Sequence, residues 1–125
     1  MALIQKFEEL WVWQEARELV KLIYQDFGYG TSGQNDYGFK DQIQRAGISI
    51  MNNIAEGFER RGIADSARFF DIAKGSCGEV RSMYYTAEDL EYVVNEIAQS
   101  RRDKAVKISK GIAGYTKALR KKIGE

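Results

Sequence analysis

The absence of proline is the feature that most restricts how this chain can fold. None of its 125 residues is proline, so no ring removes a backbone hydrogen bond from a helix interior or clashes with the preceding turn. Apolar residues recur every three or four positions along nearly the whole sequence. No segment shows the sustained alternation that is typical of a strand. We therefore predict an all-α protein.

Three breaks in the apolar pattern divide the sequence into four predicted helices. The first is the turn-forming stretch 28–36 (GYGTSGQND), the second is Arg61 with Gly62, and the third precedes Asn95, an expected N-cap. The predicted helices span residues 7–27, 37–60, 64–92 and 96–122. Because the joints are short and the helices similar in length, we expect an antiparallel up-down four-helix bundle, with residues 1–125 as one domain.

Each predicted helix carries one apolar face, which we expect to form the core. These positions are Trp13, Ala16, Val20, Ile23, Tyr24 and Phe27; then Phe39, Ile43, Ala46, Ile50, Ile54 and Gly57; then Phe70, Ala73, Cys77, Val80, Tyr84 and Ala87; and finally Ala105, Ile108, Ile112, Tyr115, Leu119 and Ile123. Cys77 is interpreted as a small buried hydrophobic residue rather than as a reactive thiol.

The composition excludes several classes of functional site. With no histidine, the chain can build neither a Ser-His-Asp or Cys-His catalytic site nor a His-ligated zinc site. Its single cysteine cannot form an internal disulfide. The N-terminal residues lack a signal-peptide pattern, and no window resembles a membrane span. We expect a cytoplasmic protein without catalytic activity, cofactor or metal.

The loop 28–36 contains the pattern GxGxxG at Gly28, Gly30 and Gly33. That pattern binds a pyrophosphate when it joins a strand to a helix. Here an amphipathic helix is predicted before it, so we interpret the loop as a flexible connector.

A polar stripe borders the apolar face of the second predicted helix. Its members are Gln42, Arg45, Ser49, Asn53 and Glu56. Arg45 and Glu56 lie about 16 Å apart along the axis, so each needs a partner elsewhere, and we expect Glu79 of the third helix to pair with Arg45. The stripe is interpreted as an internal network, a subunit contact or a ligand site. Glu56 with Glu79 also leaves open a metal-dependent hydrolase or nuclease.

Positive charge is concentrated in the last predicted helix. Residues 101–125 contain nine basic and two acidic residues, whereas the rest of the chain contains ten basic and sixteen acidic ones. The basic residues placed away from the apolar face are Lys107, Lys110, Lys117, Arg120 and Lys121. We call these five the basic ridge. It is interpreted either as a solvated or intersubunit surface or as a surface that contacts RNA phosphates.

Two large apolar residues of the first helix, Trp11 and Leu22, fall outside its predicted core face. Large aromatic residues in such positions are enriched at interfaces. We therefore consider both as candidate oligomer contacts, with scattered surface residues as the alternative.

Several short motifs occur together along the chain. They are FEEL at 7–10, VWQ at 12–14, QxxRA at 42–46, SI at 49–50, NIAEGF at 53–58 and GSxxE at 75–79. As a set they resemble the 23S rRNA intervening-sequence protein family of bacterial four-helix bundles. The family's shared polar positions correspond to the polar stripe and Glu79. Glu91 stands where the family has a glycine near the end of the third helix.

The resemblance implies a small cytoplasmic protein encoded within insertions in ribosomal RNA genes, without an established catalytic activity. A remote structural relative, the accessory protein of diversity-generating retroelements, is a pentamer that binds a reverse transcriptase and nucleic acid. By analogy we expect a homo-oligomer, a pentamer, that associates with RNA or an RNA-bound protein. A purely structural or protein-interaction module that binds no nucleic acid is the alternative.

Overall fold

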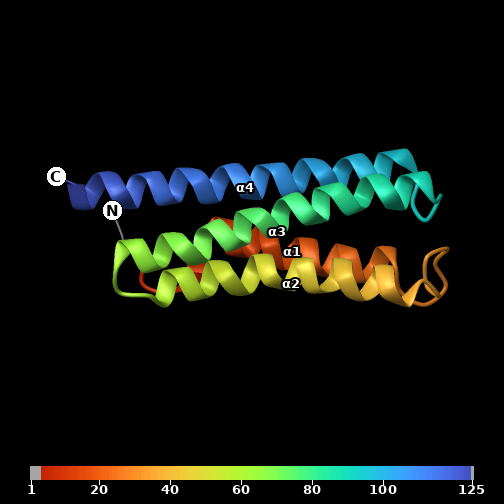
Figure 1. The fold of residues 1–125 in the computed structure, drawn as a ribbon, viewed down its shortest axis with the longest axis horizontal. Coiled ribbons are helices and arrows are strands. Elements are labelled where there is room, and N and C mark those ends of the chain that lie inside the picture. Colours follow the sequence, from red (N-terminus) through yellow and green to blue (C-terminus); the bar gives the residue numbers. More distant parts are fainter. Residues whose placement is uncertain (1–3, 125) are drawn as a thin grey trace.

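The computed structural model describes residues 4–124, with side chains to Lys121. Within this range a short 3-10 helix, η1 (Phe7–Glu9), precedes the four α-helices: α1 (Trp11–Asp26), α2 (Tyr37–Glu59), α3 (Ile63–Asp89) and α4 (Asn95–Gly124). No strand occurs in these residues. The helices form an elongated antiparallel bundle, in which the α1–α2 and α3–α4 loops lie at one end and the α2–α3 loop at the other (Figure 1). The predicted all-α four-helix bundle is confirmed.

The first helix begins later than the sequence predicts. The segment expected to start at Phe7 is interrupted at Leu10, whose backbone is extended (φ −72°, ψ 125°). The Glu9 carboxylate accepts hydrogen bonds from the backbone N–H groups of Gln5 and Lys6, at 3.0 and 3.2 Å. These bonds satisfy backbone donors just before η1, and the extended Leu10 separates η1 from α1.

The third helix ends at Asp89, three residues before the predicted end at Tyr92. Glu91 adopts φ 61°, and the N–H groups of Glu91 and Tyr92 donate to the carbonyls of Glu88 (3.0 Å) and Ala87 (2.8 Å). This pair of bonds is a Schellman motif, which normally places glycine at the left-handed position. Asn95, expected as an N-cap, is instead the first residue of α4.

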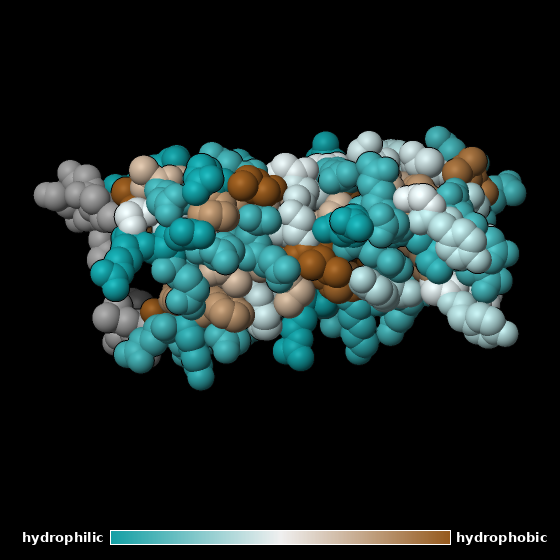
Figure 2. Space-filling model, turned by 60° about the horizontal axis from the view of Figure 1, so that its bottom comes forward, coloured by the Kyte–Doolittle hydropathy of each residue, from teal (hydrophilic) through white to brown (hydrophobic). Residues whose placement is uncertain are grey.

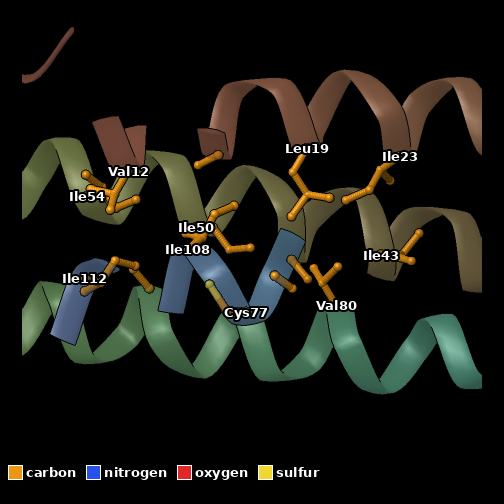
Figure 3. Packing of buried hydrophobic residues seen from close by; sticks show 14 of the residues in the cluster. Val12, Leu19, Ile23, Ile43, Ile50, Ile54, Cys77, Val80, Ile108 and Ile112 are labelled. Carbon is orange, nitrogen blue, oxygen red and sulfur yellow. The ribbon is translucent and has the colours of Figure 1, made fainter. Parts of the chain in front are cut away.

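Side chains from all four helices point into one core (Figure 3). The faces predicted for α2 and α3 are buried, apart from the half-buried Phe39. In α4, Ala105, Ile108 and Ile112 are buried, while Tyr115 and Leu119 are half-buried. The predicted core position Ile123 lies beyond the described side chains.

The predicted core face of α1 is partly wrong. Tyr24 is 44% exposed, and Trp13 and Val20 are only half-buried, whereas Val12 and Leu19 are buried. Apolar residues cover so much of this helix that their spacing does not define which part faces inward. Packing against both α2 and α4 centres the buried arc near Leu19.

Candidate nucleic-acid interface

The basic ridge lies on the outer surface of α4. All five of its side chains are exposed: Lys107, Lys110, Lys117, Arg120 and Lys121. Residues three, four or seven apart share a helix face, so these side chains lie on one side of α4. Ile108 and Ile112 lie on the opposite side and face the core. None of the five ridge residues forms an ion pair with the described part of the chain. Their charge is therefore available to a partner.

The first three cations of α4 face the bundle and are neutralised there. Arg101 donates from Nε and Nη2 to the two carboxylate oxygens of Asp26, at 2.8 and 2.9 Å. The Tyr84 hydroxyl donates to the same carboxylate at 2.7 Å. Burial, followed by the charge of Asp26, raises the pKa of Tyr84. This network ties α1, α3 and α4 together, and sequence reasoning missed it although Asp26 lies on the buried arc of α1.

Arg102 and Lys104 are also paired internally. Arg102 is 4% exposed, and its Nη1 donates to a Glu88 carboxylate oxygen at 2.9 Å. Hydrogen bonds from Asn95 and Arg102 lower the pKa of Glu88. Lys104 Nζ donates to the Glu15 carboxylate at 3.0 Å. Three of the positive charges of α4 are thus paired inside the bundle, so the exposed positive charge of this helix is smaller than its total.

The polar stripe forms a hydrogen-bonded seam between α2 and α3 at its centre. Asn53 Nδ2 donates to the Ser49 carbonyl (2.8 Å) and to the Ser49 hydroxyl (3.0 Å), and the Ser76 hydroxyl donates to Ser49 Oγ at 2.8 Å. Near one end, Gln42 Nε2 donates to the Glu79 carboxylate at 3.0 Å. The Ser76–Ser49 and Gln42–Glu79 bonds link the two helices side chain to side chain, while Asn53 holds Ser49 from within α2.

The expected pair between Arg45 and Glu79 is wrong. Arg45 lies on the outer edge of the stripe and binds Asp41, one turn earlier on the same helix, at 2.8 Å. Both side chains are largely exposed, so this ion pair contributes little to stability. Glu79 is instead engaged by Gln42, which lies closer to the α3 side of α2.

Glu56 and Glu79 are held in different places. Glu56 binds Arg60 at 2.9 Å, while Glu79 binds Gln42. Because Gln42 and Glu56 are fourteen residues apart, they are separated by about 21 Å along α2. Among the side chains described, no group of three or more acidic or cysteine residues is placed to hold a metal ion.

Trp11 joins α1 to α4 while remaining 44% exposed. The Lys107 ammonium lies 5.1 Å from the centre of its ring. A Cβ atom added at Gly111 would come within 2.9 Å of the ring, so the indole packs closely on the α4 backbone. Lys107 therefore lies on the side of the basic ridge that is next to α1. The other candidate oligomer contact, Leu22, is half-buried.

The glycine-rich loop closes one end of the bundle. Gly30 has a positive φ of 87°, and its N–H donates to Gln34 Oε1 at 3.0 Å. Gly33 is buried against the rings of Phe27 and Tyr92. The loop follows the helix α1, and its glycines serve the turn and the packing. This geometry fits the connector interpretation.

Cys77 is 2% exposed and lies on the buried seam of α3. Burial raises the pKa of its thiol from 9.0 to about 12, and the nearby Lys74 only partly opposes this shift. Because the thiolate is the nucleophile, this thiol is suited to packing rather than to chemistry.

Comparison with known proteins shows the family. Residues 8–114 match the family model described as 23S rRNA-intervening sequence protein. The chain belongs to this family. No curated protein matches the sequence. In residues 4–124, none of the helices has the length and apolarity needed to cross a membrane.

A solved structure similar to this 23S rRNA-intervening sequence protein shares its fold. It is the crystal structure of a protein of unknown function from the S23 ribosomal protein family of Bacteroides thetaiotaomicron. The TM-score is 0.78 at 24% sequence identity, and the match covers 85% of this chain and 98% of that chain. The bundle architecture is therefore shared with a solved relative.

The NIAEGF motif of this family member lies where α2 meets α3. Asn53 donates to Ser49, the α2 residue of the central seam, and Ile54 is buried in the core. Gly57 packs against Phe70, because a Cβ atom added there would lie 2.4 Å from the ring. Glu56 is exposed and pairs with Arg60. Asn53, Ile54 and Gly57, half of the motif, are thus explained by the packing of α2 in the bundle.

Proposed function

We propose that this 23S rRNA-intervening sequence protein is a binding protein, not an enzyme, and that it associates with RNA or an RNA-bound protein through the basic ridge. The observation that carries the proposal is the separation of charge within α4. Arg101, Arg102 and Lys104 are neutralised inside the bundle, whereas the ridge cations are exposed. Clustered exposed cations without an internal partner are the electrostatic requirement for contact with phosphates.

Salt dependence tests this proposal. We would measure the anisotropy of a fluorescently labelled RNA as the protein is added at several salt concentrations. Each phosphate contact with a single strand contributes about −0.7 to the slope of log K against log salt. Changing Lys107, Lys110, Lys117 and Lys121 to Glu should abolish binding at moderate salt and reduce the slope by about 3. Affinity that is independent of salt, or unaffected by these changes, contradicts the proposal.

A matched control uses exposed cations outside the ridge. Lys21 on α1 and Arg61 in the α2–α3 loop are both exposed. Changing these two to Glu alters the net charge in the same direction, yet leaves α4 intact. If the control variant loses as much affinity per charge as the ridge variant, binding follows the net charge and the ridge is not a defined surface.

We also propose that the protein forms a homo-oligomer in the cytoplasm, a pentamer by analogy with the retroelement accessory protein. Exposed aromatic residues such as Trp11, Tyr24 and Tyr37 support an interface between subunits. The face shown in Figure 2 is mostly hydrophilic with small separate hydrophobic patches, so not every face suits such a contact. These exposed aromatic residues also favour the second candidate function, a protein-interaction module that binds no nucleic acid.

Light scattering coupled to size exclusion, with and without RNA at low salt, separates the two candidates. A mass near 14.3 kDa contradicts the oligomer, and a multiple of that mass supports it. Co-elution with RNA supports the RNA-binding proposal. A stable oligomer that retains no RNA at low salt supports the protein-interaction module.

A further inference from the structure

A groove runs between α3 and α4, which lie side by side (Figure 1). It consists of two hollows of about 230 and 220 Å³ that share Lys74 as a lining residue. Arg81 lines the first hollow, and Lys117 and Arg120 line the second. Lys74 and Arg81 come from α3, so the groove extends the positive surface beyond the helix to which sequence analysis assigned it.

The charge of the groove is strongly asymmetric. Its lining contains four cations, and Asp71 is its one acidic residue among the described side chains. Gly78 lines the first hollow without a side chain, and an added Cβ there would meet no atom within 4 Å. A hollow that concentrates cations against a low-dielectric floor attracts anions more strongly than scattered surface charges do.

The shape of the groove favours a single chain of phosphates. Lys74 and Arg81 are seven residues, or about 10 Å, apart along α3. On α4, the lining from Ala105 to Arg120 extends for about 22 Å. Each hollow is smaller than a pocket for a drug-sized ligand, about 300 Å³ or more. An extended single strand can follow this line of cations along the two helices while its bases remain free to stack.

An exposed aromatic ring lies beyond the Arg81 end of the groove. Tyr85 is 56% exposed and follows Arg81 by four residues, so the two lie on the same side of α3. The Arg102 guanidinium lies 4.1 Å from the centre of the Tyr85 ring. Arg102 is itself held by Glu88 at 2.9 Å, so the ring rests on a fixed support. Exposed aromatic rings beside a basic groove are the platforms on which unpaired bases stack.

We propose that the α3–α4 groove binds single-stranded RNA, with the backbone along Lys74, Arg81, Lys117 and Arg120 and a base stacked on Tyr85. This inference rests on the proposed function, since Lys117 and Arg120 belong to the basic ridge. It adds residues of α3 and selects the single-stranded form of the nucleic acid.

The experiment compares charge reversals inside and outside the groove. The probe is a labelled twelve-nucleotide oligo(U), measured by fluorescence anisotropy at low salt. Lys74→Glu with Arg81→Glu should weaken binding by at least about tenfold and reduce the salt slope by about 1.4. Lys107→Glu with Lys110→Glu, which changes the charge equally at ridge residues that line neither hollow, should weaken binding less. Circular dichroism checks the fold, and Arg81→Gln replaces the double variant if that one unfolds.

Two further arms test the stacking platform and the strand preference. Tyr85→Ala should weaken binding by about 5- to 150-fold, whereas Tyr85→Phe retains the ring and should bind like the unmodified protein. A twelve-base-pair RNA duplex should bind more weakly than oligo(U).

The possible failures are distinguishable. Equal losses in the two double variants, or a duplex bound as tightly as oligo(U), overturn the groove assignment and leave the proposed function standing. An unmodified protein that binds neither RNA at low salt overturns both.

Discussion

Gly57 is the position where one added methyl group should have the clearest effect on stability. A Cβ atom there would lie 2.4, 2.7 and 2.9 Å from three carbons of the Phe70 ring. Phe70 is 1% exposed, and its ring packs edge-on against Tyr115 with a centroid distance of 5.5 Å. The ring therefore has little room to move away from a new side chain.

The expected magnitude follows from two opposing contributions. Overpacking a core costs about 1–3 kcal/mol, and contacts this short place Gly57→Ala at the upper end. Replacing glycine by alanine within a helix gains about 1 kcal/mol. We expect a net loss of about 2 kcal/mol in the free energy of unfolding.

Gly75 provides the matched control. It also lies inside a helix, α3, but an added Cβ would meet no atom within 4 Å. Gly75→Ala should therefore stabilise the protein by up to about 1 kcal/mol. The difference of about 3 kcal/mol between the two variants measures the clash with Phe70.

The assay is equilibrium unfolding in urea followed by far-ultraviolet circular dichroism. The slope with urea should be similar in all variants if each unfolds in one cooperative step. Phe70→Leu in the Gly57→Ala background should recover part of the loss. If Gly57→Ala proves as stable as the unmodified protein, the ring yields freely and the packing reason for glycine in NIAEGF is refuted.

Three other predictions concern the ends and interior of the bundle. Asp26→Ala should cost about 3 kcal/mol in urea unfolding, because it leaves the inward-facing guanidinium of Arg101 without its partner; an unchanged midpoint would contradict this. Glu91→Gly should raise stability by about 1 kcal/mol, since it relieves a non-glycine residue at φ 61°, and a lower melting temperature would refute the strain. Stability should fall above pH 9.0, because the Cys77 thiol ionises when unfolded but keeps its proton in the folded state up to about pH 12. The loss should be about 1.4 kcal/mol per pH unit, and Cys77→Ala should show a correspondingly shallower decline.

Sequence patterns predicted the helices and most of the core because both depend on local spacing. In α3 the positions from Phe70 to Ala87 that step by three and four are all buried. The exposure of the basic ridge follows from the same geometry, since its residues lie opposite Ile108 and Ile112. The end of α3 was misplaced because Glu91 occupies the left-handed position that normally carries glycine.

Only the tertiary structure decided which polar side chains meet. Arg101 binds Asp26 across 75 residues of sequence, and Tyr84 reaches the same carboxylate across 58. The partner of Glu79 is Gln42 rather than Arg45, and Lys74 shares a groove with Lys117. Periodicity defines the side of a helix on which a residue lies, but the rotation and axial register between helices select its partner. Those two quantities arise from the packing of all four helices at once, so they cannot be obtained from the spacing within any one of them.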